Sequence, residues 1–200
     1  MSRIIVLRHG RTEWNDLGKF QGAVDVALDD VGRSQAEAAA VVLAQLPITV
    51  VVSSDLSRAL ETATVVANRL GVGVRIDERL RERAYGPWEG LTRAEIEAKY
   101  PDEFVAWQRR EPVELPGIED RDVVAERGGR ALAEVADAVR PGEVALVSSH
   151  GATSRQALGW FLGWTPEQTD TVFGLSNCHW ADLRSTPSGW RLHGYNLSAM

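Results

Sequence analysis

The feature that most constrains the fold of this chain is a series of short apolar runs that alternate with helix-forming segments. Residues 4–7, 49–52 and 144–147 are continuous and mostly β-branched or aliphatic, and a shorter run lies at 74–76. Continuous runs of this length are typical of strands that are buried on both faces. The pattern therefore predicts an α/β fold, a three-layer sandwich in which helices cover both faces of a mostly parallel central sheet.

The segments between these runs have the composition of helices. Helices are predicted over residues 30–46, 56–70, 92–100, 101–109, 120–139 and 152–162. Pro47 ends the first of them, because proline cannot continue a helix. Thr92 and Glu95 have the spacing of a capping box at a helix start. Near the C-terminus, segments 178–184 and 189–194 flank a Thr-Pro-Ser-Gly turn and predict a terminal hairpin.

Length and composition predict one globular domain over residues 1–200. The chain is 44% hydrophobic and 25% charged, close to the averages for globular proteins, and it has no repeat, low-complexity tract or recognisable linker. It enters an apolar run almost at once, without the pattern of a signal peptide. No run approaches the roughly 20 apolar residues that a membrane-spanning helix needs. We therefore expect a cytoplasmic protein with no membrane partner.

The charge balance argues against nucleic acid as the main partner. The net charge is −6 and the basic residues are scattered, whereas nucleic-acid-binding proteins usually carry a basic face. An anionic ligand must then be held by a local group of arginines. Cys178 is the only cysteine, so no disulfide can form within the chain, and we expect it to be a small buried residue.

Polar residues follow three of the predicted strands at the point where each strand ends. The segments are Arg8-His9-Gly10-Arg11-Thr12, Ser53-Ser54-Asp55-Leu56-Ser57-Arg58 and Ser148-Ser149-His150-Gly151. Ligands of open α/β sheets bind beyond the carboxyl ends of the strands, so these groups converge if the strands are neighbours. Guanidinium groups match the dispersed charge of a phosphate. A neutral imidazole can attack phosphorus, and a protonated one can stabilise the transferring oxygens. The three segments together predict a phosphate site.

The same segments resemble the signature motifs of the histidine phosphatase superfamily, the phosphoglycerate-mutase-like family. Residues 8–15 match its R-H-G-x-T-x-x-N pattern, and the resemblance extends over about residues 3–165 in the order of the family. The other matching segments are Phe20-Gln21-Gly22, residues 53–63, Leu80-Arg81-Glu82, Gly86-Pro87-Trp88-Glu89-Gly90 and Val147-Ser148-Ser149-His150-Gly151.

The resemblance implies a role for five catalytic residues. His9 would be the nucleophile that becomes phosphorylated, and Arg8, Arg58 and His150 would hold the phosphoryl oxygens. Glu82 would protonate the leaving oxygen and then activate water, a role that suits a carboxyl group with a raised pKa. Its arginine neighbours along the chain would point away from it if this stretch is extended.

The resemblance also implies a set of residues that contact the substrate. They are Asn15, Gln21, Gly22, Tyr85, Arg109, Arg110 and Gly151. Asn15 would donate a hydrogen bond to the phosphate, and the backbone of Gln21 and Gly22 would line the entrance. Gly151 has no Cβ and lets backbone approach the ligand closely.

The catalytic core serves two activities in this family, which differ in what accepts the phosphate. Tyr85, Lys99, Arg109 and Arg110 fall at spacings that resemble the substrate contacts of the mutases. A helix and a hairpin use up the residues after His150, which leaves no tail to close the site and favours access of water. We therefore predict a metal-independent phosphomonoesterase that forms a phosphohistidine intermediate on a small anionic phosphate ester, either a sugar phosphate or a phosphoglycerate derivative. The alternative is a 2,3-bisphosphoglycerate-dependent phosphoglycerate mutase.

Two other classes of protein fit the sequence less well. A catalytically silent phospholigand-binding protein would lack the nucleophile or the acid, and both are present. A dinucleotide-binding fold would carry G-x-G-x-x-G after the first strand, where Arg8-His9 stands. No Cys/His cluster or carboxylate pair has metal-ligand spacing, so we expect no metal or cofactor. A homodimer is possible by analogy with the family.

Overall fold

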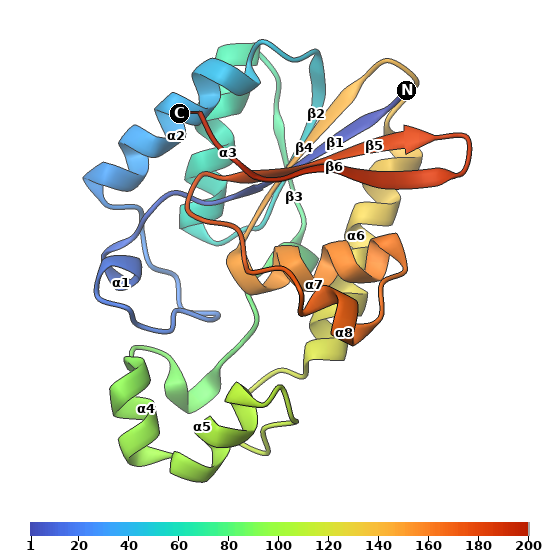
Figure 1. The fold of residues 1–200 in the computed structure, drawn as a ribbon. Coiled ribbons are helices and arrows are strands. Elements are labelled where there is room, and N and C mark those ends of the chain that lie inside the picture. The colour runs from blue at the N-terminus through green and yellow to red at the C-terminus, as the bar shows by residue number, and fades with distance from the viewer. Residues whose placement is uncertain (200) are drawn as a thin grey trace.

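Six strands form one mixed sheet in the computed structural model, which describes residues 1–199 (Figure 1). The strands are β1 (Arg3–Arg8), β2 (Ile48–Ser53), β3 (Val74–Ile76), β4 (Val144–Ser149), β5 (Trp180–Thr186) and β6 (Gly189–Leu197). Their order across the sheet is β3-β2-β4-β1-β5-β6. The first four in this order run parallel, and the hairpin of β5 and β6 adds two antiparallel strands at one edge.

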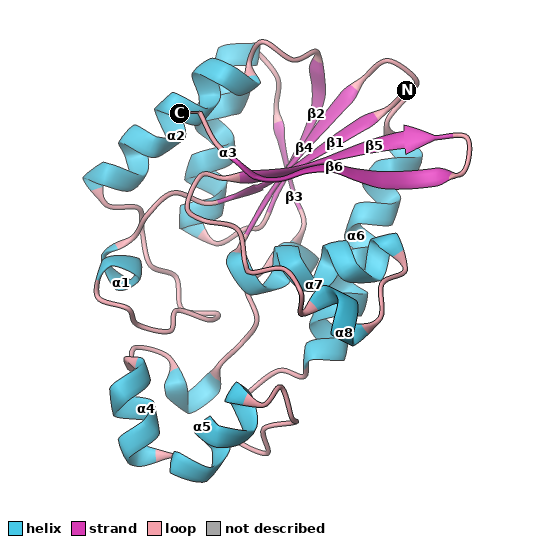
Figure 2. Ribbon diagram, in the orientation of Figure 1, coloured by secondary structure: helices cyan, strands magenta, loops and turns pink. Residues whose placement is uncertain are grey.

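Helices cover both faces of the sheet, as Figure 2 shows. The helices α2 (Asp30–Leu43) and α3 (Ser57–Leu70) pack on one face, and α6 (Arg121–Ala138) and α7 (Gly151–Leu162) pack on the other. Successive side chains of β1 alternate between the two cores. Ile4 and Val6 join the core under α6 and α7, whereas Ile5 and Leu7 join the core under α2 and α3. The predicted three-layer α/β sandwich is confirmed.

A third apolar cluster lies apart from the two faces of the sheet. Its short elements are η1 (Glu78–Leu80), η2 (Gly86–Trp88), α4 (Arg93–Lys99) and α5 (Pro101–Gln108). Trp88 is fully buried there against Ile96, Phe104 and Val113. In Figure 1, α4 and α5 lie below the sheet, away from the helices that cover it. Within residues 1–199, no helix is both long and apolar enough to span a membrane.

The predicted helices and the terminal hairpin all form, with differences at their ends. Helix α2 ends at Leu43 instead of residue 46, because the chain turns there and the N–H of Leu46 donates to the Leu43 carbonyl. The sequence reading missed α1 (Glu13–Asp16) and α8 (Pro166–Thr169), which are too short to show a helical period. Each begins with a capping box, which is the signal that could have revealed it.

The loop at residues 116–119 needs a left-handed backbone conformation only at Gly117. Gly117 has a φ of +85° and lies against Gly86. A Cβ on Gly86 would come within 2.8 Å of the Gly117 carbonyl carbon. Ile118 follows Gly117 in this loop. Its φ is not positive, and its side chain packs against the third apolar cluster. The isoleucine is therefore compatible with the loop and adds apolar contact to it.

Two glycines bring the loop after β1 directly onto the first turn of α2. A Cβ on Gly10 would lie 2.4 Å from the carbonyl oxygen of Gly32, and a Cβ on Gly32 would lie 2.0 Å from the carbonyl oxygen of Arg11. Both obstacles are backbone atoms, which cannot rotate out of the way as a side chain could. This close contact fixes the loop that carries His9.

We expect Gly32→Ala to lower the free energy of unfolding by about 2 kcal/mol, measured by urea denaturation. Alanine is the better helix former by about 1 kcal/mol, but overpacking of this kind costs about 1–3 kcal/mol and more where backbone must move. Gly73→Ala is the matched control, because a Cβ there meets nothing within 4 Å. An unchanged or higher stability of Gly32→Ala would contradict the proposed contact.

Candidate active site

The ends of β1 and β4 bring His9 and His150 together. These parallel strands pair in register from Arg3 opposite Val144 to Arg8 opposite Ser149, so both end at the same level. The N–H of His9 then donates to the Ser149 carbonyl over 3.0 Å. The two imidazole rings are both buried, and their centroids lie 5.1 Å apart. The predicted convergence of the two His-Gly segments is confirmed.

Two arginines beside these histidines have no carboxylate partner within residues 1–199. Arg58 from α3 is fully buried, and its two Nη atoms donate to the carbonyls of Val24 and Gly22. Arg8 donates through Nη1 to the carbonyl of Leu175. The Nε atoms of both arginines are buried without a hydrogen-bond partner. Since burying a cation without a counter-charge is costly, this pair of guanidinium groups is poised for an anion.

Burial keeps both histidines neutral. It holds the pKa of His9 well below its usual value, and the charges of Arg8 and Arg58 lower it further. The pKa of His150 is lowered in the same way, first by burial and then by Arg58. His9 Nδ1 lies 2.7 Å from the Gly10 carbonyl oxygen. Because a carbonyl only accepts, Nδ1 carries the proton and Nε2 keeps its lone pair for attack.

The second histidine is oriented by a serine. His150 Nε2 lies 2.9 Å from Ser54 Oγ, in the segment that follows β2. His150 Nδ1 is buried and has no partner within the described residues. Nδ1 is therefore the ring atom left for a ligand oxygen, provided that it carries a proton.

Glu82 is held at the first turn of α7. Its carboxylate accepts hydrogen bonds from the backbone N–H groups of Arg83, Ala152 and Thr153 at 2.9–3.1 Å, and from the Thr153 hydroxyl at 3.1 Å. Neither neighbouring arginine pairs with it, as the sequence predicted. Arg81 pairs with Asp55, and Arg83 lies over the ring of Tyr85.

Arg127 of α6 supports the segment that carries Glu82, and the sequence reading did not find it. Its guanidinium donates to the carbonyls of Arg79, Arg81 and Glu82 at 2.6–3.3 Å, and it forms a two-point pair with the carboxylate of Glu119. One arginine thus donates hydrogen bonds to three carbonyls of an irregular segment that has no neighbouring strand to pair with them. No sequence motif identifies such a role, because the partners are backbone atoms.

The groups converge on a pocket of about 310 Å³. The predicted residues that line it are Arg8, His9, Asn15, Gln21, Gly22, Arg58, Glu82 and Tyr85. His150 lies beneath the His9 ring, and Gly151 faces Arg8, since a Cβ there would sit 3.5 Å from Arg8 Cζ. Burial and then the nearby Glu82 raise the pKa of Tyr85 to about 12, so its hydroxyl remains a donor. We call this cavity the phosphate pocket.

Three further residues at this pocket escaped the sequence analysis. Lys19 and Arg93 add positive charge to its lining, and Trp107 adds an aromatic wall over which the Arg93 guanidinium lies at 5.4 Å. Lys19 directly precedes the segment Phe20-Gln21-Gly22, which resembles the family, and this position could have identified it as a residue of the site. Arg93 follows the capping residue Thr92 at the start of α4, and only the packing of α4 against α5 directs it to the pocket.

Asn15 is held in place by neighbouring side chains. Its Oδ1 accepts from the Thr12 N–H and from Asn177 Nδ2 over 3.2 and 3.1 Å. Asn177 Nδ2 also donates to the His9 carbonyl over 3.1 Å. Since Oδ1 is engaged, the Asn15 side chain presents its NH₂ group as the donor to a ligand. Asn177, which the sequence reading missed, thus ties Asn15 to the loop of His9.

Arg109 and Arg110 do not line the phosphate pocket. Arg109 is exposed at the end of α5, and Arg110, with a φ of +66°, lines a different pocket. Lys99, placed by the same spacing argument, is exposed over the ring of Tyr100. Among residues 1–199, no three His, Cys, Asp or Glu side chains are arranged to hold a metal ion.

The neutral buried histidines predict a loss of stability in acid. An unfolded histidine has a pKa near 6.5, above that of either histidine in the fold. The two histidines therefore do not lower the free energy of unfolding above about pH 6.5. Below that pH it falls, because the histidines of the unfolded chain bind protons that those of the folded chain do not. We expect the free energy of unfolding to fall by about 1.4 kcal/mol per pH unit for each histidine below pH 6.

Urea unfolding at several pH values measures this effect. His150→Gln removes one of the two groups and should remove about half of the histidine-dependent slope. His193→Gln serves as the control, because the side chain of His193 is 57% exposed. Equal slopes in the wild type and in His150→Gln would contradict the electrostatic picture of the site.

Known proteins have sequences similar to nearly the whole of this chain. Residues 4–198 match the histidine phosphatase superfamily (branch 1). The chain is 36% identical to the glucosyl-3-phosphoglycerate phosphatase of Mycolicibacterium vanbaalenii over 98% of this chain and 95% of that protein. It is 35% identical to the 2,3-bisphosphoglycerate-dependent phosphoglycerate mutase 2 of Gloeobacter violaceus over 86% of this chain and 81% of that protein.

Solved structures of related enzymes have the same fold. The mycobacterial glucosyl-3-phosphoglycerate phosphatase in complex with VO₃ superposes with a TM-score of 0.89 at 35% identity, covering 98% of this chain and 99% of that one. The phosphoserine phosphatase of Entamoeba histolytica with 3-phosphoglyceric acid gives a TM-score of 0.86 at 27% identity, covering 99% and 98%. With a family model that matches residues 4–198 and relatives that are similar over nearly the whole chain, the chain belongs to the histidine phosphatase superfamily.

Proposed function

We propose that this phosphomonoesterase hydrolyses a phosphoglycerate derivative through a phosphohistidine formed on His9, without a metal ion. The observation that carries the proposal is the placement of a neutral His9 beside fully buried Arg58 and partly buried Arg8, neither of which has a carboxylate partner within residues 1–199. An imidazole with a free Nε2 is a nucleophile, and the arginines attract the phosphate that it attacks. Membership of the superfamily supports the same chemistry.

In the first step, Nε2 of His9 attacks phosphorus and the ester P–O bond breaks. The guanidinium groups of Arg8 and Arg58 hold the phosphoryl oxygens, where charge develops. Glu82, protonated at this stage, gives its proton to the leaving oxygen, so that an alcohol departs. The Gly10 carbonyl accepts from Nδ1 and fixes the ring for attack.

In the second step, water replaces the alcohol and the phosphohistidine is hydrolysed. The Glu82 carboxylate takes a proton from the attacking water, the P–N bond breaks and His9 recovers its lone pair. The N–H groups of Ala152 and Thr153 keep the carboxylate in place between the two steps. Inorganic phosphate then leaves, and the enzyme returns to its starting state.

His150 acts as a donor to the phosphoryl group once the phosphate is bound. Burial, and then the charge of Arg58, lower the pKa of His150 and keep the ring neutral. A phosphate dianion brings the opposite charge into the same space, which favours the protonated ring. Ser54 holds Nε2, so Nδ1 is the atom that meets the phosphoryl oxygen.

The entrance of the phosphate pocket suits a substrate with a second negative charge. Lys19 and Arg93 line it together with the rings of Phe20 and Trp107. A phosphoglycerate carries a carboxylate close to its phosphate, and a sugar attached to it could lie on an aromatic wall. Relatives that match nearly the whole chain include glucosyl-3-phosphoglycerate phosphatases. We therefore propose glucosyl-3-phosphoglycerate or a similar glycosylated phosphoglycerate as substrate.

A mutase is the second candidate, because Tyr85 lines the pocket at the spacing from Glu82 that resembles the mutases. The mutase relative from Gloeobacter violaceus matches less of the chain than the phosphatases do. Arg109 and Arg110 lie outside the phosphate pocket, which weakens the comparison with the mutase contacts.

A panel of phosphate esters separates the two activities. Glucosyl-3-phosphoglycerate, phosphoserine, 3-phosphoglycerate and p-nitrophenyl phosphate are assayed for phosphate release, while formation of 2-phosphoglycerate is followed in parallel. We expect phosphate release without isomerisation, with the highest kcat/KM for the glycosylated ester. Isomerisation stimulated by 2,3-bisphosphoglycerate would identify a mutase instead.

Glu82→Gln tests the proton transfer to the leaving group. We expect the single-turnover rate of phosphoryl transfer from alkyl phosphate esters to His9 to fall at least about 100-fold, the usual scale of a general acid. The same rate for p-nitrophenyl phosphate should fall much less, because nitrophenolate needs no proton to leave. The attack of water, which Glu82 assists for every ester, does not enter this rate. Glu78→Gln is the matched control, an exposed carboxylate on the same segment. Equal losses on both kinds of ester would remove Glu82 from the acid role.

A further inference from the structure

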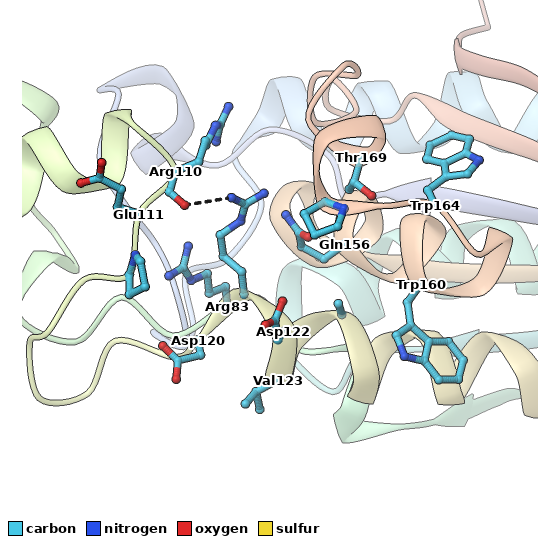
Figure 3. Close-up of a pocket in the computed structure, with 14 residues that line it drawn as sticks. Arg83, Arg110, Glu111, Asp120, Asp122, Val123, Gln156, Trp160, Trp164 and Thr169 are labelled. Atoms are coloured by element: carbon cyan, nitrogen blue, oxygen red, sulfur yellow. Dashed lines mark hydrogen bonds between the residues drawn. The ribbon is translucent and has the colours of Figure 1, made fainter.

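A second and larger pocket of about 600 Å³ lies outside the phosphate pocket (Figure 3). It is formed where the loop after α5 meets the start of α6 and the helices α7 and α8. None of the residues that line it also lines the phosphate pocket. Figure 3 shows Arg83 and Arg110 on one side of this pocket and Gln156, Trp160 and Trp164 on the other. We call it the arginine pocket.

Arg83 is the most unusual group in this lining. It is only 7% exposed, and within residues 1–199 it forms no ion pair. Its Nε donates to the Glu119 carbonyl over 2.7 Å, and its guanidinium lies 5.4 Å from the centre of the Tyr85 ring. Its two Nη atoms have no hydrogen-bond partner in the described chain. Because Arg83 lines the pocket, these Nη donors are available to a ligand there.

Three further arginines share one carboxylate beside it. Asp170 Oδ1 lies 2.5 Å from an Nη of Arg121, 3.7 Å from Arg155 and 4.0 Å from Arg110. Arg155 is 9% exposed, and the Nε atoms of Arg121 and Arg155 are buried without a partner. Since three guanidinium groups share the single charge of Asp170, positive charge is in excess on this side of the pocket.

The rest of the lining includes an acidic rim and an aromatic wall. The carboxylates of Glu111, Asp120 and Asp122 belong to exposed residues, where water and salt screen them. Trp160 and Trp164 supply flat apolar surface. Arginine forks recognise carboxylate and phosphate groups, and indole faces pack on rings.

We propose that the arginine pocket is a second, non-catalytic anion site, which binds a small molecule that carries a carboxylate or phosphate group on a ring. The anionic group lies on Arg83 and Arg110, and the ring packs against the two tryptophans. This site does not depend on the activity proposed above. It also reassigns Arg110, which the sequence placed with the substrate of the catalytic site.

Titration calorimetry with phenylphosphonate tests the proposal. This probe carries a dianion and an aromatic ring, and its C–P bond is not an ester that the enzyme could hydrolyse. We expect two binding sites per chain in the wild type, one in each pocket. Arg110→Gln should weaken one site at least 10-fold and leave the other, because a charge-assisted contact at a partly buried site is worth more than about 1.4 kcal/mol. The side chain of Arg110 is 41% exposed, so this variant should fold.

Arg109→Gln is the matched control, since Arg109 lines neither pocket. It should keep both sites. Benzoate and inorganic phosphate, titrated separately, show whether the carboxylate or the phosphate is the preferred group. A single site per chain in the wild type, or two sites that survive Arg110→Gln unchanged, would overturn the proposal. Equal weakening by Arg109→Gln would also overturn it, because the effect would then be one of general charge.

Discussion

The site depends on the parallel, in-register pairing of β1 with β4. Because Arg8 pairs with Ser149, both strands end at the same level and their next residues are His9 and His150. A shift of one residue would turn every side chain of β1 to the opposite core, so that its four apolar side chains would lose their present packing partners. The distance between the two imidazoles follows from this register.

Around this frame the protein retains charged groups in unfavourable surroundings. Arg58 is fully buried, and only carbonyl oxygens accept from it. Such an arrangement costs stability, which the surrounding α/β core supplies, and functional sites often carry a cost of this kind. Its benefit is a pocket whose donors already point at the position of the phosphoryl group, so that little reorganisation is needed during reaction.

The fold and the centre of the site could be predicted from the sequence, for clear physical reasons. Buried strands read as continuous apolar runs, and the catalytic groups follow directly after them along the chain. Residues that act through long-range packing could not be found in this way. Arg93 and Asn177 reach the site only because separate loops fold back onto it. Arg110 was placed by spacing alone, which assumes that the chain after α5 turns toward the catalytic site, whereas Arg110 lines the arginine pocket.

The most direct test of the account is to trap the phosphoryl group on the enzyme during turnover. The enzyme is mixed with excess ester, quenched in alkali, where phosphohistidine survives, and mapped by peptide mass spectrometry. The account predicts one phosphoryl group on the peptide that contains His9, and neither a phosphoryl group nor phosphate release in His9→Ala. A phosphoryl group on another residue, or turnover by pure His9→Ala, would contradict it.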